Sequence, residues 1–277
     1  MQKIENVKYW RDSELTGLET SLVKDSGHVF PNHSHESVYA IGLMFEGGSY
    51  CLGPQREDAF VAPGEIALIN PGQVHSGVPA SGAKATYRMI YVDVDLMREA
   101  AKEMFESDGR LPIFEKTVVH HPELYFSLWR ICQLIPSKTD LMEKESSVID
   151  SLVPLISNFG GLKEISLKPA NNRRIITQTK ELLSSDLERK ISLEEAARAV
   201  SLSRYHFLRV FKKETGLPPH VFRTQQRVEA SKRLLRRKIP FAQVALETGF
   251  ADQSHFVNKF RQFIGATPTQ YLSVYAG

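Results

Sequence analysis

Residues 239–271 have the sequence IPFAQVALETGFADQSHFVNKFRQFIGATPTQY, and residues 191–222 have the sequence ISLEEAARAVSLSRYHFLRVFKKETGLPPHVF. The two stretches repeat one pattern, in which Ile191 aligns with Ile239 and Gly216 with Gly265. In each copy a short apolar stretch at helical spacing is followed by a break and then by a second amphipathic stretch that ends at the glycine. Two helices joined by a three- or four-residue turn form a helix-turn-helix unit. The sequence therefore predicts two such units.

The second helix of each copy is the predicted DNA contact. Its inner stripe carries Phe207 and Phe211 in the first copy and Phe256 and Phe260 in the second. A recognition helix offers its outer N-terminal residues to base edges in the major groove. The residues expected to read bases are Tyr205, Leu208, Arg209, Ser254, His255 and Asn258. Phosphate contacts position the protein without specifying sequence, and the residues expected to make them are Ser203, Arg204, Lys212, Lys213, Gln253, Lys259 and Arg261.

The segment that joins the two copies, residues 219–238, has helical periodicity and is predicted to end at Pro240. Its basic residues are expected on the solvent sides, namely Arg223, Arg227, Lys232, Arg233, Arg236 and Arg237. A helix of about 20 residues spans about 30 Å, which suits the roughly 34 Å between successive major-groove faces. One domain is thus predicted to read two neighbouring groove faces.

The charge of the chain is divided between its two halves. We place a boundary at residues 169–172, where the composition is typical of a linker. Residues 1–170 carry 16 Lys and Arg against 23 Asp and Glu, a net charge of −7, whereas residues 171–277 carry 19 against 9, a net charge of +10. A compact basic half is the electrostatic footprint of a polyanion binder. The alternative, an ordinary basic helical surface, does not account for the duplicated unit.

Residues 173–272 resemble the DNA-binding domain of the AraC family of bacterial transcription regulators. The residues that carry the resemblance lie in the two quoted stretches and in RVEASKRLL, which starts at Arg227. The resemblance implies a regulator, an activator in many members, that binds promoter or operator DNA. It also implies a homodimer, a contact with RNA polymerase and a small-molecule effector bound by the other domain.

The acidic half has a different pattern. Short apolar or alternating runs separated by Gly and Pro turns predict the strands of a sandwich or barrel, at residues 18–24, 38–45, 59–62, 66–69 and 86–94. Helical periodicity follows at residues 95–106, 122–135 and 140–158. The predicted fold is therefore a two-domain α+β architecture. A β-barrel with added helices, residues 1–170, precedes an all-α domain with two helix-turn-helix units joined by a long helix, residues 171–277.

Two stretches of the first half resemble the cupin motifs of the AraC-family effector domain. These are PNHSHES at residues 31–37 and PGEIALINPGQVHSG at residues 63–77. The mouth of such a barrel is the expected effector pocket. Its candidate lining residues are His33, His35, Tyr39, Tyr50, His75 and Arg88. Arg88 and His35 suit an anionic group, unless Arg88 pairs with Glu46 and lines nothing.

The three histidines allow a second interpretation, a facial metal site. Metal-binding cupins usually add a glutamate a few residues after the second histidine, where this chain has Tyr39 or Ala40, and Glu36 adjoins His35 instead. We therefore expect no metal and no cofactor besides the effector. The histidines are interpreted as a pocket wall or a structural hydrogen-bonding set.

Residues 141–159 carry apolar side chains at three-, four- and seven-residue steps, at Leu141, Val148, Leu152, Leu155 and Phe159. This spacing fits a dimerisation seam, and it fits equally a helix packed on the barrel. Pro154 interrupts a regular coiled coil. The residues leave these two alternatives open.

The remaining features bear on compartment and function class. Cys51 and Cys132 make neither a disulfide framework nor a zinc-finger spacing, and no run approaches the ~18 apolar residues of a membrane span. We expect a soluble, cytoplasmic protein that does not contact the membrane. The predicted function is a sequence-specific transcription regulator controlled by an effector, and not an enzyme. The alternatives are a metal-dependent cupin enzyme fused to a DNA-binding domain and a DNA binder without effector.

Overall fold

The computed structural model describes residues 6–52, 58–105, 110–137, 139–161 and 171–273. The chain divides into two compact units. The first is built mainly from residues 1–30 and 34–165, and the second mainly from residues 166–272. The expected boundary between residues 170 and 171 adjoins residues 162–170, which lie outside the described part. No helix in the described ranges is long and apolar enough to cross a bilayer.

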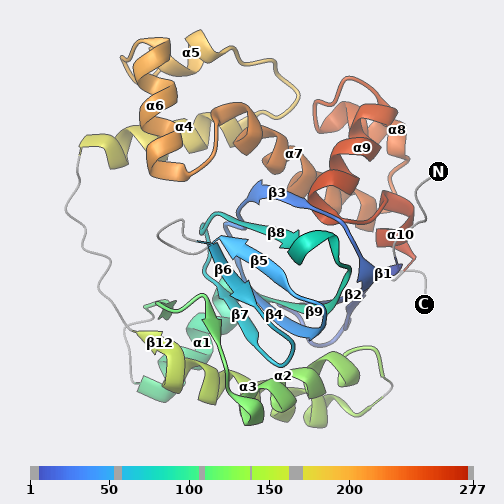
Figure 1. The fold of residues 1–277 in the computed structure, drawn as a ribbon. Coiled ribbons are helices and arrows are strands. Elements are labelled where there is room, and N and C mark those ends of the chain that lie inside the picture. The colour runs from blue at the N-terminus through green and yellow to red at the C-terminus, as the bar shows by residue number, and fades with distance from the viewer. Residues whose placement is uncertain (1–5, 53–57, 106–109, 138, 162–170, 274–277) are drawn as a thin grey trace. The chain divides into compact units, whose positions relative to one another are not determined.

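The described strands of the first unit form two larger sheets and one two-stranded ladder (Figure 1). The six-stranded sheet has the order β1 (Asn6–Arg11), β2 (Leu18–Ser26), β9 (Ala85–Asp93), β4 (Val38–Glu46), β7 (Ile66–Ile69) and β11 (Val118–Val119). The four-stranded sheet has the order β3 (Phe30–His33), β8 (His75–Pro79), β5 (Ser49–Leu52) and β6 (Asp58–Val61). A short ladder joins β10 (Ile113–Phe114) to β12 (Gly160–Gly161), and a 3-10 turn, Ala80–Gly82, precedes β9.

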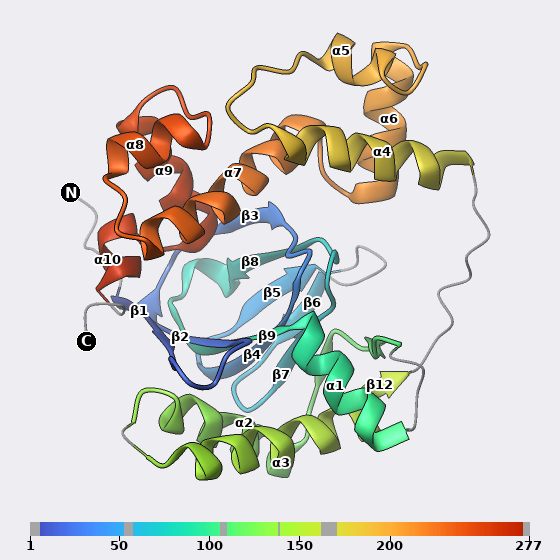
Figure 2. The same cartoon turned by 180° about the vertical axis from the view of Figure 1, so that it is seen from behind.

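Alternation along the six-stranded sheet sends neighbouring side chains to opposite faces. Tyr39, Ile41 and Leu43 of β4 join a large apolar core with three helices. These helices are α1 (Val94–Phe105), α2 (Pro122–Leu134) and α3 (Leu141–Phe159). Ala40 and Met44 instead join a smaller apolar cluster on the other face, together with residues of β6, β7 and β9. One face of the sheet is therefore covered by helices, while the other contributes to the inside of the barrel (Figure 2).

The predicted β-rich domain with added helices is confirmed. The three expected helices coincide with α1, α2 and α3 to within one residue at each end. Each of the five expected strand regions contains a strand. Sequence periodicity missed β1, β3, β5 and β8 and the two-residue strands β10, β11 and β12. Most of these strands are too short to establish an alternation, and polar residues interrupt the longer ones.

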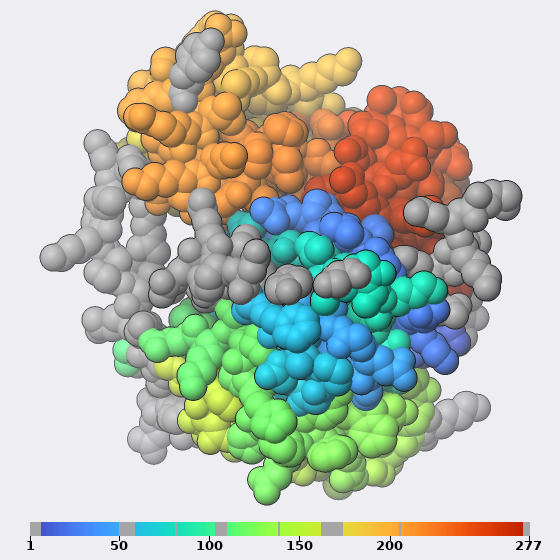
Figure 3. Space-filling model, in the orientation of Figure 1, coloured from blue at the N-terminus to red at the C-terminus, as the bar shows by residue number. Residues whose placement is uncertain are grey.

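The structure decides between the two interpretations of residues 141–159. Val148, Leu152 and Leu155 are buried in the core of the first unit, and Leu141 and Phe159 pack against that core. The apolar stripe is therefore the inner face of α3 packed on the domain, and its interpretation as a dimerisation seam is wrong. The space-filling view shows the α2–α3 layer lying against the strands (Figure 3).

A buried ion pair ties α3 to the turn after β1. Lys144 Nζ lies 2.6 Å from Asp12 Oδ2 and also donates to the Ser137 carbonyl at 2.9 Å. Both charged side chains are nearly buried, with exposed fractions of 8% and 10%. Burial acts to raise the pKa of Asp12, but the Lys144 hydrogen bond, two backbone N–H donors and the Lys144 charge together lower it below its usual value.

The second unit is entirely helical. Its helices are α4 (Asn171–Ser185), α5 (Leu193–Arg198), α6 (Arg204–Thr215), α7 (Pro219–Arg236), α8 (Phe241–Glu247), α9 (Gln253–Ile264) and α10 (Pro268–Leu272). The pairs α5–α6 and α8–α9 are the two predicted helix-turn-helix units, and α7 is the predicted joining helix. This helix ends at Arg236, and Pro240 serves as the N-cap residue of α8 rather than as the end of α7.

Replacing Asp12 tests the buried pair. Asp12→Asn keeps the Oδ1 acceptor for the backbone but removes the charge, leaving Lys144 buried without its counterion. We expect the free energy of unfolding to fall by about 3 kcal/mol at pH 7. The pKa of the Asp12 carboxyl is lower in the folded protein than in the unfolded chain, where it is about 3.9. Its contribution to stability is therefore complete above the unfolded pKa and is lost as the pH falls through the folded pKa. The difference between variant and wild type, measured by urea unfolding, should therefore shrink below about pH 4.

Asp25→Asn is the matched control, because Asp25 pairs with Lys84 in an exposed ion pair. Exposed pairs contribute less than about 1 kcal/mol. Equal losses in the two variants, or a loss in Asp12→Asn that does not shrink at all as the pH falls below about 4, would contradict the assignment.

Candidate DNA-binding surface and effector domain

The two predicted recognition helices, α6 and α9, are built in the same way. Ser203 caps α6 by accepting from the His206 N–H, and Asp252 caps α9 by accepting from the His255 N–H. Each helix ends at a glycine in the left-handed conformation, Gly216 with φ 80° and Gly265 with φ 76°. Glycine adopts that conformation without the steric cost of a Cβ. The local sequence therefore fixes both ends of each helix.

The inner faces of these helices are aromatic. Phe207 and Phe211 of α6 are fully buried, as are Phe256 and Phe260 of α9. The rings of each pair lie 5.7 Å apart between centroids. Burial of these rings fixes the rotation of each helix, so that its opposite face is presented to solvent.

Most residues expected to contact DNA lie on the exposed faces. Among the base-reading candidates, Leu208, Arg209, Ser254, His255 and Asn258 are exposed, and the side chain of Tyr205 lies outside the described part. Of the phosphate candidates, Ser203, Arg204, Lys212, Lys213, Gln253 and Arg261 are exposed, and Lys259 is half-buried. Some of them also have local partners: His255 Nδ1 accepts from the Ala251 N–H at 3.4 Å, and Lys259 Nζ donates to Gln262 at 3.1 Å.

The structure corrects the predicted exposure of Arg223 of α7. It was expected on a solvent side, but it is only 7% exposed. Its guanidinium donates to the carbonyls of Leu183 at 2.9 Å, Asp186 at 2.6 Å and Arg189 at 2.5 Å. Burial lowers the pKa of Arg223, and the negative charge of Asp186 opposes that shift. The buried guanidinium thus holds the end of α4 and the loop after it against α7.

The same loop reaches the second helix-turn-helix unit. Arg227 of α7 donates from Nε and from an Nη to the Leu187 carbonyl, at 3.1 and 2.9 Å. Gly249, in the turn between α8 and α9, has φ 73°, and a Cβ added to it would lie 2.0 Å from the Leu187 oxygen. The equivalent residue of the first turn, Ser201, is also left-handed, with φ 57°. Glycine is required in the second turn because the loop after α4 packs directly against it.

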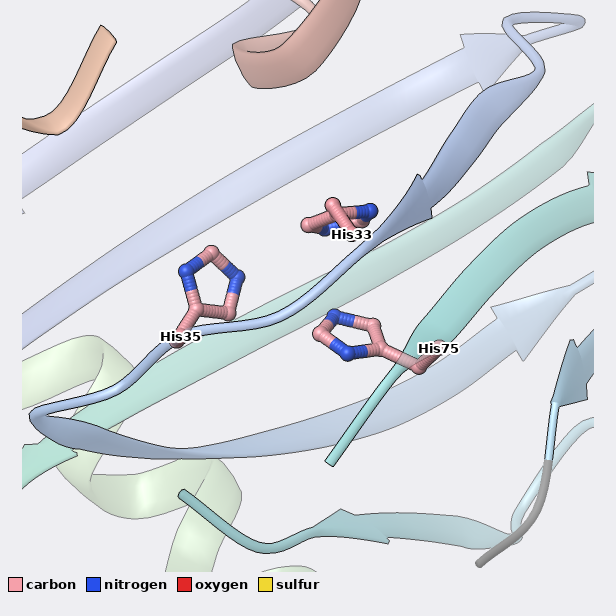
Figure 4. Close-up of side chains that lie close together, drawn as sticks. All are labelled: His33, His35 and His75. Atoms are coloured by element: carbon pink, nitrogen blue, oxygen red, sulfur yellow. The ribbon is translucent and has the colours of Figure 1, made fainter. Parts of the chain in front are cut away.

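In the first unit, the structure separates the expected pocket residues into two groups. His33, His35 and His75 lie together, with the His35 and His75 rings 5.2 Å apart between centroids (Figure 4). Tyr39 is fully buried on the helix-covered face of the sheet, where its hydroxyl donates to the Pro112 carbonyl at 2.8 Å. The side chain of Tyr50 lies outside the described part.

Arg88 likewise lies on the helix-covered side. It donates to the Cys132 carbonyl of α2 at 2.9 Å and stacks on Trp10. Its expected alternative partner, Glu46, instead accepts from Thr86. Burial raises the pKa of the neighbouring Cys132 thiol to about 12. The structure therefore brings neither Tyr39 nor Arg88 to the histidines.

Tyr91 was missed by the sequence analysis. Its ring contacts His35 edge to face, with 5.6 Å between centroids, and it packs against the apolar cluster on the inner face of the sheet together with Met89. Alternation along β9 places Tyr87, Met89 and Tyr91 on one face and Arg88 and Ile90 on the other. The alternation was visible in the sequence, but the sequence did not show which of the two sets of side chains faces the barrel.

Known proteins resemble both halves of the chain. An AraC-like ligand binding domain family matches residues 16–152, and a helix-turn-helix domain family matches residues 196–273. The HTH-type transcriptional regulator YbfI of Bacillus subtilis is 32% identical over 238 residues, covering 86% of this chain and 85% of that protein. The arabinose operon regulatory protein of Escherichia coli is 24% identical over 244 residues, covering 84% and 80%.

A solved structure supports the same fold. Wild-type ToxT from Vibrio cholerae, crystallised with a bound unsaturated fatty acid, has a TM-score of 0.57 and 13% identity, over 99% of this chain and 98% of that chain. At that identity the likeness concerns the fold.

The chain belongs to the AraC family of transcriptional regulators. It is a DNA-binding regulator with an N-terminal ligand-binding domain and a C-terminal helix-turn-helix domain. The family consists of regulators rather than enzymes, which argues against a cupin enzyme fused to a DNA-binding domain.

Gly249→Ala tests the contact between the loop after α4 and the second turn. The substitution meets the cost of a left-handed alanine, about 1–2 kcal/mol, and in addition a clash with the Leu187 carbonyl. Gly64→Ala is the control, because Gly64 has φ 83° and a Cβ at this position would have nothing within 4 Å. We expect the loss of unfolding free energy, measured in urea, to be clearly larger for Gly249→Ala. Equal losses would show that the contact contributes nothing.

Proposed function

We propose that this protein is a sequence-specific transcription regulator whose binding to DNA is controlled by a small molecule held in its N-terminal barrel. The observation that carries the proposal is the pair of capped helices, α6 and α9, which expose polar outer faces and are attached to one rigid helix, α7. Residues 1–170 form the effector-binding unit of the proposal, and residues 171–277 form the DNA-binding unit.

The DNA-reading surface of the proposal consists of the exposed outer residues of α6 and α9. Arg209 is suited to the O6 and N7 acceptors of guanine, and Asn258 to the N6 and N7 pair of adenine. Tyr205, Leu208, Ser254 and His255 complete the set that faces bases. The net charge of +10 on residues 171–277 supplies the attraction to phosphates that precedes base recognition.

The effector site of the proposal is the inner face of the six-stranded sheet near the three histidines. Tyr91 and Met89 face the same side, so the site combines apolar surface with imidazole groups. That combination suits an apolar molecule with an anionic end. The fatty acid found in ToxT is a ligand of this kind, so long-chain and aromatic carboxylates are the first class to test.

The regulator is further proposed to act as a homodimer that contacts RNA polymerase at promoters in the cytoplasm. Support for a dimer comes from the outer side of the α2–α3 layer, where Phe126, Trp129, Met142 and Ile149 are exposed. Large apolar side chains that stay exposed on two packed helices are what a protein–protein interface would cover. Sedimentation equilibrium of the full chain tests the dimer, and a monomer at micromolar concentration would contradict it.

Arg209→Ala tests base recognition. With a DNA site obtained by selection from random sequences, we expect specific binding to weaken by about 1–3 kcal/mol and the preference to relax at one base position. Binding to random DNA should change much less. The measurement is a fluorescence-anisotropy titration against the selected site, its single-base variants and a random duplex.

Lys259→Ala provides the contrasting variant, because it is assigned to a phosphate. It should reduce the slope of log affinity against log salt by about 0.9 while leaving base preference unchanged. If Arg209→Ala weakens binding equally on random and selected DNA, Arg209 is a phosphate contact and its proposed role is wrong.

Control by an effector is tested with the full chain. A panel of carboxylates is screened for an increase in the melting temperature, and each hit is then added to the DNA titration. A true effector should change DNA affinity by about 5–150-fold, the usual range of allosteric coupling. Tyr91→Ala should weaken the response, whereas Tyr39→Phe, on the other face of the sheet, should not. A stabilising ligand that leaves DNA affinity unchanged would contradict effector control.

A further inference from the structure

Three histidine side chains converge at one end of the barrel, where strands β3 and β8 lie side by side in the four-stranded sheet (Figure 4). His33 ends β3, His35 follows two residues later, and His75 begins β8. One ring nitrogen of each residue lies within 4.8 Å of the corresponding nitrogens of the other two. All three side chains are nearly buried, with exposed fractions of 7%, 9% and 5%. The sheet thus gathers three imidazoles from two segments that are 40 residues apart in sequence.

Two of the rings are oriented by the backbone in the same way. His33 Nδ1 lies 2.7 Å from the Pro31 carbonyl, and His75 Nδ1 lies 3.1 Å from the Gln73 carbonyl, in each case two residues earlier in the chain. A carbonyl oxygen only accepts hydrogen bonds, so each Nδ1 carries the proton and Nε2 of the neutral ring carries the lone pair. An Nδ1–H bond to a carbonyl, with the lone pair on Nε2, is the arrangement found around metal-bound histidines.

His35 is held to the same site by the backbone. The Gly72 N–H donates to the His35 carbonyl at 2.7 Å, which joins the segment after β3 to the turn before His75. Tyr91 packs against the His35 ring from the inner face of β9. These contacts hold the third imidazole beside the other two without requiring a ligand to gather them.

The donor set selects a class of ion. Tyr39 contributes nothing to the cluster, because it lies on the opposite face of the sheet and donates to the Pro112 carbonyl. The donors that the cluster offers are therefore three imidazole nitrogens. Imidazole donors suit zinc, copper, nickel and ferrous iron, whereas magnesium and calcium require oxygen ligands. At Zn–N distances of about 2.0–2.1 Å, tetrahedral ligand nitrogens lie about 3.3 Å apart, which modest side-chain rotations reach from the observed spacing.

We propose that His33, His35 and His75 bind one divalent transition-metal ion of the zinc class, with at least one coordination position left for a further ligand. Nε2 of His33, Nε2 of His75 and one ring nitrogen of His35 are the protein ligands. This site goes beyond the proposed function and does not depend on it, because an ion bound here could be detected whether or not the protein responds to an organic effector.

The test uses the full chain without a polyhistidine tag, stripped with a chelator and desalted. Zn²⁺ is titrated in competition with a chromophoric chelator, and Co²⁺ is added separately to record its visible ligand-field absorption. We expect one Zn²⁺ per chain and a Co²⁺ spectrum of a four- or five-coordinate site with nitrogen ligands. His33→Ala and His75→Ala should each weaken Zn²⁺ affinity on the order of a hundredfold.

His120→Ala is the matched control, since His120 is an exposed histidine of the same unit. It should leave the affinity unchanged. Circular dichroism confirms that each variant is folded, and His75→Gln replaces His75→Ala if the latter does not fold. The proposal is overturned if wild-type protein binds Zn²⁺ no more tightly than the His33→Ala/His75→Ala double variant. It is equally overturned if His120→Ala loses as much affinity as the single variants, because the binding is then adventitious. Neither result bears on DNA binding, which is measured independently.

Discussion

The buried guanidinium of Arg223 holds the DNA-binding unit together. An arginine withdrawn from water is costly unless its donors are satisfied, and here three backbone carbonyls around the end of α4 satisfy them. One turn further along α7, Arg227 binds the Leu187 carbonyl, and that carbonyl in turn packs against Gly249 of the second helix-turn-helix unit. The same loop, residues 186–189, reaches the first helix-turn-helix unit through the ion pair of Arg189 with Glu195 of α5. The spacing of α6 and α9 along α7 follows from these contacts, so the folded unit itself sets the distance between the two helices.

The ligand-binding unit depends on a different constraint, the alternation of side chains across its central sheet. Tyr39 and Arg88 lie on the face that packs on α1, α2 and α3, where both donate to backbone carbonyls. Tyr91 and Met89 lie on the face that closes the barrel. A small molecule in the barrel would meet the second set and the histidines. The sheet is the element that both sets of side chains share, so it connects the inside of the barrel to the helix-covered face.

Much of this architecture could be predicted from the sequence, because the relevant signals are local. Gly216 and Gly265 mark helix ends through the lack of a side chain, and α6 and α9 end immediately before them. The aromatic pairs at four-residue spacing correctly identified the inner faces of both helices. The limits of α1, α2 and α3 followed from the same kind of periodicity. The short strands β3, β5 and β8 carried no such signal, since four or five residues with mixed polarity do not establish an alternation.

Properties that depend on two distant segments could not be derived in this way. Arg223 has the pattern of a solvent-facing residue within α7, and its burial is caused by a loop that lies about forty residues earlier. The stripe from Leu141 to Phe159 is equally compatible with a partner helix and with the domain core, and the packing of α3 on the sheet selected the core. The amino-acid sequence alone determined the class of each half, the two repeated units and the ends of their helices. Caps, periodicity and charge are properties of neighbouring residues, so they can be recognised without the tertiary structure. Which face of β4 and β9 lines the barrel and which structural role Arg223 has were settled by folding. Those outcomes depend on strand pairing and on contacts between segments far apart in the chain, where the free energy of burial acts on the folded surface as a whole.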